Sequence, residues 1–312
     1  GSIVLGTLDA GSVSGMTNAP PNMAANKKAI KLRMKSVRNT RKITKAMELV
    51  AASKMRRAIA QALKSRTYAR AAEQTIGDAL AYLPEGVSHA LLQVHPNAKK
   101  TLFIVLSSDR GLAGGLNANL VRFSRDTLKD IPNDVLDIIA VGKKGGDGLQ
   151  RLGKNVVARF PALSNNPALA DLLPVAHMAL NGFLEGTYKE VRVLFTDFVS
   201  GVSQVPATNT LLPLQRVATE GAEAKPDAIF EPSAQDVLDA TLPALAETLL
   251  WQMLLESVAS EHAARMMAMK NASDAASDML SSLTFTYNQA RQGAITQEIA
   301  EISGGKSALE SE

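Results

Sequence analysis

The feature that most limits the possible folds is an uninterrupted stretch of helix-forming residues near the N-terminus. Between Asn26 and Leu83 the chain has no proline and only one glycine, Gly77. Ala, Lys, Arg, Met, Gln and Leu dominate this stretch, and all of them favour the helical state. A helix of this length would extend for about 80 Å at about 1.5 Å per residue. This is much longer than a compact domain needs, so the sequence predicts one long helix that requires a partner.

Apolar residues recur along this predicted helix at spacings of three and four, which places them on one face. We interpret that face as the stripe that contacts the partner. Its members are Ile30, Met34, Val37, Ile43, Met47, Val50, Met55, Ile59 and Leu63.

A second long helix is predicted at the other end of the chain. Ser233 or Asp236 can cap its N-terminus, and Gly304 and Gly305 are expected to stop it after Ile302. Its apolar stripe includes Leu245, Leu249, Leu255, Val258, Met266, Met269, Leu280, Leu283, Tyr287, Ile295 and Ile299. Two long helices at opposite chain ends, with a domain between them, must run antiparallel if they pair along their length. The sequence therefore predicts a long antiparallel coiled coil, because too few residues remain to cover a helical bundle of that length.

The charges of the two ends support this pairing. Residues 27–70 contain 15 Lys and Arg side chains and one acidic side chain, whereas residues 234–312 contain four basic and eleven acidic ones. Opposite net charges favour the association of the two helices, although each exposed ion pair contributes little.

The middle of the chain changes to the pattern of strands alternating with helices. The apolar, β-branched runs are Thr101–Ser107, Val135–Val141, Asn155–Phe160 and Val191–Phe198, and Val205–Leu214 can add an edge strand. Helical stretches occupy Asn117–Leu128, Gly146–Leu152 and Pro167–Glu185. This order predicts a mostly parallel sheet with helices on its faces. The predicted fold class is therefore α/β, with the coiled coil of terminal helices carrying a Rossmann-like domain.

The expected domain boundaries follow from these elements. We predict a flexible N-terminal tail over residues 1–25, a coiled-coil helix over 26–84 and the α/β domain over 99–214. The C-terminal coiled-coil helix is expected over 233–304, and a short tail over 305–312. No run of 18 apolar residues exists that could span a membrane.

Residues suited to catalysis or to cofactor binding are not evident. The chain has no cysteine and only four widely spaced histidines. The loop Ser107–Gly115 follows the first strand but lacks GxGxxG, and we interpret it as a tight glycine turn. Gly142–Gly146 is another glycine turn, and Gly305–Ser307 has Ala300 where a P-loop needs its first glycine. We therefore predict no catalytic residue, no metal site and no cofactor.

The basic N-terminal helix allows an alternative function, that of a coiled-coil nucleic-acid-binding or scaffold protein. Clustered Lys and Arg side chains favour binding to phosphates. However, Tyr68 is the one aromatic residue within the basic residues 27–70, so this segment offers no platform on which bases could stack. The charges also surround an apolar stripe, which is typical of a coiled-coil strand whose sides meet acidic protein loops.

Three separated motifs resemble the gamma-subunit family of F-type ATP synthases. Ala29–Met55 is similar to the opening helix of that family, and Ser107–Leu116 (SSDRGLAGGL) is similar to its strand-to-loop motif. Ser260–Ile302 resembles its closing helix. The order of the three motifs is the same, and the resemblance extends from about Asn26 to Gly305.

The resemblance implies a non-catalytic central stalk, present in one copy per complex, that holds no nucleotide. Its helices would stand inside a hexamer of three alpha and three beta subunits, and its lower end would meet the epsilon or delta subunit and the c ring. Proton-driven rotation would then drive each beta subunit through its conformational cycle. The chain would be peripheral to the membrane through the c ring. The expected site is the matrix side of the mitochondrial inner membrane, or alternatively the cytoplasmic face of a bacterial membrane.

The resemblance also implies contact residues. Five side chains match positions that contact beta-subunit loops: Met47, Arg265, Gln292, Thr296 and Glu298. Five consecutive residues match the foot that touches the c ring: Asp227, Ala228, Ile229, Phe230 and Glu231.

Overall fold

The computed structural model describes residues 23–84, 86–163, 165, 167–215 and 230–309. The chain divides into two compact units. The larger unit contains residues 42–273, and the smaller unit contains the residues before and after that range. Residues 1–22 of the predicted tail lie outside the described residues.

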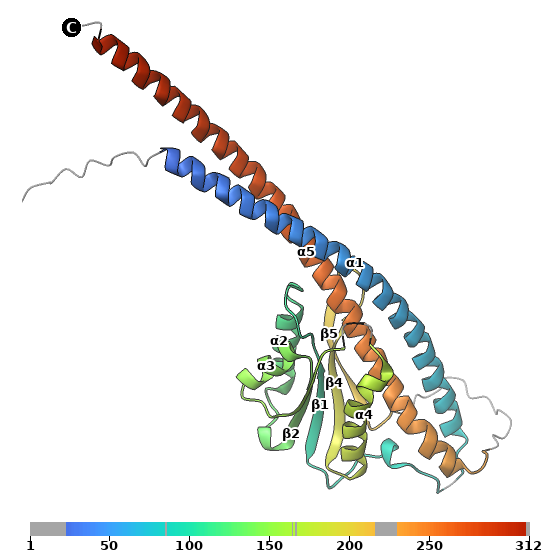
Figure 1. The fold of residues 1–312 in the computed structure, drawn as a ribbon. Coiled ribbons are helices and arrows are strands. Elements are labelled where there is room, and N and C mark those ends of the chain that lie inside the picture. Colours follow the sequence, from blue (N-terminus) through green and yellow to red (C-terminus); the bar gives the residue numbers. More distant parts are fainter. Residues whose placement is uncertain (1–22, 85, 164, 166, 216–229, 310–312) are drawn as a thin grey trace, which may run out of the picture. The chain divides into compact units, whose positions relative to one another are not determined.

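The two predicted terminal helices are present (Figure 1). They are α1 (Met23–Ala81) and α5 (Ala234–Leu309). The cap at the start of α5 is Ser233, whose Oγ accepts the backbone N–H of Asp236 at 3.1 Å and donates to its carboxylate at 2.6 Å. This reciprocal cap satisfies a backbone donor that the first turn of a helix leaves free.

Within the larger unit the two helices run antiparallel. Leu80 of α1 lies near Leu242 and Leu245 of α5, whereas Ala51 of α1 lies near His262. Residue numbers therefore increase along α1 in the direction in which they decrease along α5, which is the antiparallel arrangement that the sequence predicts.

The buried stripe of α1 differs from the predicted one. Four of its buried side chains are alanines at spacings of seven and four: Ala51, Ala58, Ala62 and Ala69. Thr44 and Leu80 are the other buried residues of the described part of α1. Ile43, Val50 and Leu63 are instead more than half exposed. The interpretation of the large apolar residues as the contact stripe is therefore wrong at these three positions. Alanines leave room for two helices to approach closely, and larger side chains would hold them apart.

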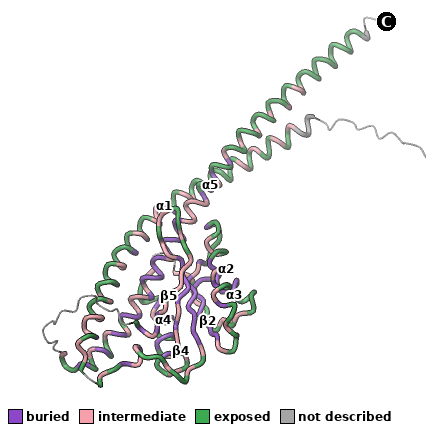
Figure 2. Tube along the Cα trace, turned by 180° about the vertical axis from the view of Figure 1, so that it is seen from behind, coloured by how far each residue is buried: buried purple, intermediate pink, exposed green. Residues whose placement is uncertain are grey.

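A five-stranded sheet forms the centre of the larger unit, in the order β3-β2-β1-β4-β5. The strands are β1 (Lys100–Leu106), β2 (Leu136–Val141), β3 (Val156–Phe160), β4 (Tyr188–Phe198) and β5 (Gln204–Leu212). All neighbours are parallel except β4 and β5, which are antiparallel. The mostly parallel sheet and its edge strand are confirmed. Strands β1 and β2 are almost entirely buried, as expected for central strands that are covered on both faces (Figure 2).

Helices cover both faces of this sheet (Figures 1 and 2). One apolar cluster joins α2 (Leu116–Leu128) and α3 (Lys143–Arg151) to β1, β2 and β4. The second and larger cluster joins α4 (Leu169–Leu184) and the described parts of α1 and α5 in this unit to the opposite face. Two short 3₁₀ helices, Ala90–Leu92 and Asn133–Val135, lie in the connections. The three predicted helices of the α/β domain are thus confirmed.

The smaller unit contains the remaining parts of the two long helices. Arg41 Nη1 donates to Ser277 Oγ at 3.3 Å and so connects them. The expectation that Gly304 and Gly305 stop the second helix is wrong, because α5 continues to Leu309. A glycine ends a helix when it adopts the left-handed conformation, and neither of these glycines has a positive φ angle. Among the described residues, no helix is apolar and long enough to cross a membrane.

The alanine stripe gives a prediction with neighbouring test and control positions. Ala62 is 3% exposed and Leu63 is 53% exposed. We expect Ala62→Leu to destabilise the chain by about 1–3 kcal/mol, because the added methylenes overpack the helix contact. Leu63→Ala should change stability by less than about 0.5 kcal/mol. Urea unfolding, followed by the fluorescence of the single tryptophan Trp251, measures both. A larger loss for Leu63→Ala would contradict the burial pattern.

Candidate functional site

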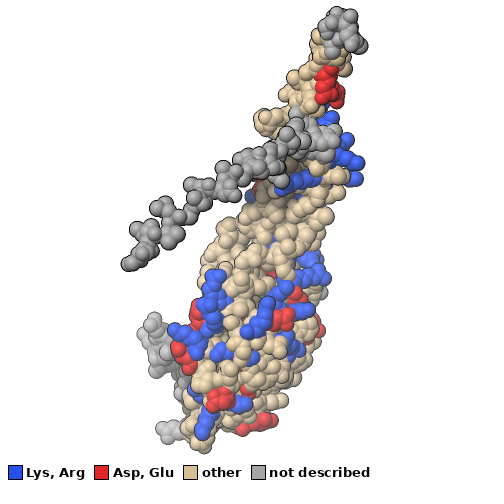
Figure 3. All heavy atoms as spheres, turned by 90° about the vertical axis from the view of Figure 1, so that its left-hand side faces the viewer, with Lys and Arg blue, Asp and Glu red and all other residues tan. Residues whose placement is uncertain are grey.

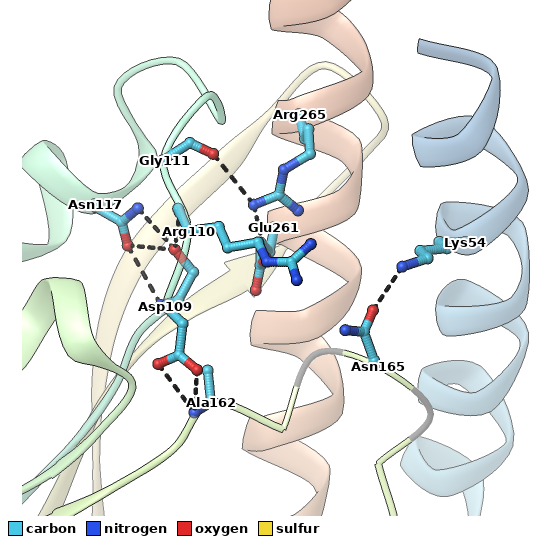
Figure 4. Close-up of polar contacts among 10 residues, drawn as sticks. Lys54, Asp109, Arg110, Gly111, Asn117, Ala162, Asn165, Glu261 and Arg265 are labelled. Carbon is cyan, nitrogen blue, oxygen red and sulfur yellow. Dashed lines mark hydrogen bonds and ion pairs between the residues drawn. The ribbon is translucent and has the colours of Figure 1, made fainter. Parts of the chain in front are cut away.

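The loop after β1 is hydrogen-bonded to two other loops at the carboxyl edge of the sheet, namely those that follow β2 and β3. Asp109 accepts the backbone N–H of Lys143 at 2.8 Å. It also accepts the backbone N–H of Ala162 at 3.2 Å (Figure 4). Ser108 Oγ donates to the carbonyl of Arg110 at 2.8 Å and accepts from the side chain of Asn117 at 2.8 Å. The polar side chains of this motif therefore bind the protein's own backbone and side chains, which is a structural role.

The turn at Gly142 brings α3 against the end of β1. Gly142 has a φ angle of +93°, and a Cβ atom there would lie 2.1 Å from the carbonyl oxygen of Ser107. Glycine is therefore required at this position. The predicted glycine turn is confirmed at Gly142, although Lys143 already begins a helix.

The first N–H groups of α3 are already occupied. Lys143 N donates to Asp109, Lys144 N to the Ser108 carbonyl at 2.9 Å, and Gly145 N to Ser107 Oγ at 2.9 Å. A phosphate site at a helix N-terminus needs these donors free. The structure thus explains physically why glycine and lysine residues in this segment do not form a phosphate cradle.

The crevice where open α/β sheets bind ligands lies between β1 and β4, because the strand order reverses there. Helix α5 fills it. Ser257 Oγ accepts the N–H of Thr196, and Ser260 Oγ donates to the carbonyl of the same residue, both at 3.2 Å. The remaining cavity has a volume of about 10 Å³, which is enough for about one water molecule. A dinucleotide does not fit in it.

Met47 and Arg265 are brought together at one cavity of about 450 Å³ in the larger unit. Met47 is half-buried. The guanidinium of Arg265 contacts the Glu261 carboxylate at 2.8 Å and donates to the Gly111 carbonyl at 3.4 Å (Figure 4). Lys54 and Asn165 close another part of the cavity through a 2.6 Å hydrogen bond. Helices α1 and α5 and the loop after β1 therefore meet at this cavity.

The other predicted contact residues lie elsewhere in the chain. Gln292, Thr296 and Glu298 are exposed on α5 in the smaller unit, and Thr296 Oγ1 donates to the Gln292 carbonyl at 3.0 Å. Of the predicted foot, Phe230 is half-buried and Glu231 is exposed. Asp227, Ala228 and Ile229 lie outside the described residues.

Several residues of the site were missed as individual positions by the sequence reasoning. From the sequence, Asp109 is placed only in a glycine turn and Asn117 only at the start of a helix, and neither Lys54 nor Asn165 is singled out. The signal for Asp109 was available, because polar side chains that directly follow a buried parallel strand gather at one edge of the sheet. The pairing of Lys54 with Asn165 depends on how α1 lies against a loop more than 100 residues away.

Tyr188, whose pKa is raised, lies at the other end of the sheet. The buried carboxylate of Asp137 accepts from Lys100 at 3.1 Å, Asn155 at 2.8 Å and the Tyr188 hydroxyl at 3.3 Å. Burial and the Asp137 charge raise the pKa of Tyr188 to about 12. A phenol with this pKa is a poor general acid or base near neutral pH, so the cluster stabilises the fold. Among the described residues, no three His, Asp or Glu side chains are arranged to hold a metal ion.

The surface charges of the α/β domain are mixed. On the face of the larger unit drawn in Figure 3, Lys and Arg side chains alternate with Asp and Glu side chains and form no continuous basic surface. This distribution does not favour the alternative of a nucleic-acid-binding protein, which needs an extended basic footprint.

Comparisons with known proteins agree with this picture. The family model described as ATP synthase matches residues 26–309. The ATP synthase gamma chain of Herpetosiphon aurantiacus is 44% identical over 293 residues, covering 91% of this chain and 99% of the relative. That of Symbiobacterium thermophilum is 41% identical over 289 residues, covering 92% of this chain and all of the relative.

Two solved structures share the fold. A chain of the central stalk and c-ring structure of the Tetrahymena thermophila mitochondrial ATP synthase has a TM-score of 0.59 and 25% identity, covering 74% of this chain and 99% of that one. A chain of the Euglena gracilis mitochondrial ATP synthase has a TM-score of 0.65 and 18% identity, covering 92% of this chain and 96% of that one.

In the part of the chain that the structure describes, α5 fills the crevice of the sheet and the first N–H groups of α3 are occupied. The match to gamma chains extends over nine-tenths of the sequence. The chain therefore belongs to the ATP synthase gamma-chain family and is a non-catalytic subunit, the central-stalk rotor of the complex.

Proposed function

We propose that this gamma chain couples the rotation of a proton-driven c ring to the conformational cycle of beta subunits in a hexamer of three alpha and three beta subunits. One copy would serve each complex, and an epsilon or delta subunit would bind beside it in the central stalk. The chain would perform no chemistry itself. Its contribution would be a contact energy that differs from one beta subunit to the next.

The observation that carries this proposal is the exposure of large apolar side chains on the two long helices. Each of the following is more than half exposed: Leu32, Ile43, Leu49, Val50 and Leu63 on α1, and Phe285, Ile299 and Ile302 on α5. The buried stripe of α1 contains mostly alanines instead. Apolar side chains exposed along a helix are typical of a surface that other proteins cover, as expected of a shaft inside a ring.

A binding partner shifts a conformational equilibrium only by the difference in its affinity for the two conformations. The rotating chain can therefore drive a beta subunit from one conformation to another only if it binds the two conformations with different affinities. The N-terminal helix is strongly basic over residues 27–70, whereas the C-terminal helix region is acidic overall. A beta subunit would therefore meet different charges as each helix passes, and this difference would bias its conformation.

The individual contacts remain part of the proposal. We assign Met47 and Arg265 to beta-subunit contacts because they share an accessible cavity of the larger unit. Gln292, Thr296 and Glu298 are exposed on α5 and available to a neighbour. Residues 227–231 would form the foot on the c ring, as the resemblance implies.

The membrane to which the complex belongs is also proposed. The sequence-based expectation was the matrix side of the mitochondrial inner membrane, with the cytoplasmic face of a bacterial membrane as the alternative. Three relatives with more than 40% identity come from bacteria, so they favour the alternative.

Assembly with separately prepared alpha and beta subunits tests the proposed function. We expect the chain to have no ATPase activity alone and to co-purify in a 1:3:3 ratio as a complex that hydrolyses ATP. Addition of a c ring should then yield a complex in which ATP hydrolysis rotates the ring. Nucleotide-saturable hydrolysis by the pure chain would contradict the proposal, as would failure of the chain to join the hexamer.

A pair of glutamines on α5 tests the beta-subunit contact. Gln292 and Gln297 are both exposed, but only Gln292 is among the proposed contacts. We expect Gln292→Ala to weaken the association of the chain with the hexamer by about 1 kcal/mol, the typical net value of one hydrogen bond. Gln297→Ala should have a smaller effect. Binding of labelled chain to the hexamer measures both, and an equal loss in the two variants would remove Gln292 from the contact.

A further inference from the structure

The end of β4 is held to α5 through both backbone groups of one residue. Thr196 donates its N–H to Ser257 Oγ, and its carbonyl accepts from Ser260 Oγ. These serines lie one turn apart on the face of α5 that meets the sheet. The next residue along β4, Asp197, is therefore fixed beside α5 with its carboxyl group close to both long helices.

One arginine connects the three elements at this point. Arg66 of α1 donates through Nε at 3.0 Å and through Nη2 at 2.7 Å to the same oxygen, Oε1, of Glu256 on α5. Its Nη2 also lies 3.8 Å from Asp197 Oδ1 on β4. A third donor, Gln252 Nε2, reaches Glu256 Oε1 at 2.7 Å. We call Arg66, Asp197, Gln252 and Glu256 the joint.

The charges of the joint do not balance if both carboxyl groups are ionised. Arg66 from α1 and Asp197 from β4 are the charged groups that face Glu256, and Gln252 is neutral. Two carboxylates and one guanidinium would leave a net negative charge where the Glu256 side chain is 10% exposed. Burying an unbalanced charge is costly. One proton on the pair makes the joint neutral.

The contacts indicate where that proton lies. Oε1 of Glu256 accepts three donors, and a side-chain hydrogen bond also joins Glu256 to Asp197. Two ionised carboxylates have no donor between them, so this hydrogen bond requires a proton on one of the two groups. The Asp197 side chain is 40% exposed and keeps contact with water, whereas that of Glu256 is buried. Burial raises the pKa of Glu256, and the hydrogen bond with Asp197 raises it further, while Gln252 and Arg66 act in the opposite direction.

We propose that Glu256 is a neutral carboxylic acid that donates its proton to Asp197, and that this pair, bridged by Arg66, is the joint through which the α/β domain passes torque to the two long helices. The torque role rests on the proposed function, whereas the shared proton is a property of the chain alone. Arg66, Asp197 and Glu256 are thus positioning residues that keep the helices from turning relative to the sheet.

Glutamine at position 256 tests the shared proton directly. The amide oxygen of Glu256→Gln can accept the same three donors, and its NH₂ group can donate to Asp197, so it imitates the protonated acid. Because the folded state holds the proton above the ordinary pKa of 4.5, wild type should lose stability relative to E256Q as the pH rises from 4.5. The ratio of the wild-type unfolding constant to that of E256Q should rise by up to about tenfold per pH unit until the pKa of the folded state is reached.

The measurement uses the full chain, urea unfolding and Trp251 fluorescence between pH 4.5 and 8. Asp274→Asn removes an exposed carboxylate from α5 outside the joint, and the pH dependence common to both variants is subtracted. Glu256→Ala leaves Arg66 without its acceptor and should unfold more readily than E256Q throughout this range. A ratio that stays constant, or that falls with rising pH as for an ordinary ionised salt bridge, would overturn the shared proton.

Rotation under load tests the torque role. In the assembled complex, ATP-driven rotation against a viscous load should slow or slip for Glu256→Ala and Arg66→Ala, while E256Q behaves as wild type. Equal behaviour of Glu256→Ala and wild type would overturn the role of the joint. If the wild-type chain itself does not rotate, the proposed function fails, and the unfolding ratio still decides the question of the proton.

Discussion

The packing of α5 against the carboxyl edge of the sheet is the constraint on which the rest of the structure depends. The segment around Ser257 and Ser260 fills the crevice between β1 and β4, and both serines bind the backbone of Thr196. The same turns of the helix contribute Glu256, which contacts α1 through Arg66. One helix therefore completes the core of the α/β domain and also pairs with the other terminal helix.

This arrangement explains how a fold typical of nucleotide-binding proteins can serve without a nucleotide. In such sheets the ligand site is the crevice at the switch point and the free N–H groups of the following helices. Here α5 fills the crevice, and side chains and carbonyls of the loop after β1 take the N–H groups of α3. The glycines that suggest a phosphate loop are needed for another reason, since Gly142 must pass within contact distance of Ser107.

On α1, the small side chains that stabilise the fold and the large side chains proposed to contact other subunits lie on different faces of the helix. Alanines pack the helix closely into the larger unit, so the contact that holds the helices needs little side-chain volume. Larger residues such as Ile43, Leu49 and Leu63 are consequently left exposed. In a rotor that is covered by other subunits, an exposed apolar surface is protected in the complex, and it would be a liability only in the free chain.

The sequence by itself determined the two long helices, their antiparallel pairing and the order of strands, because helix propensity and apolar periodicity are local properties. It also determined the family, through motifs at both ends and in the loop after β1. Only the tertiary structure decided which face of α1 is buried, since spacing predicts a stripe but not whether Leu63 or its neighbour Ala62 faces the partner. It likewise decided that α5 continues past Gly304, because a glycine stops a helix only in the left-handed conformation. The joint of Arg66, Asp197 and Glu256 depends on three elements far apart in the chain, so no local pattern could reveal it.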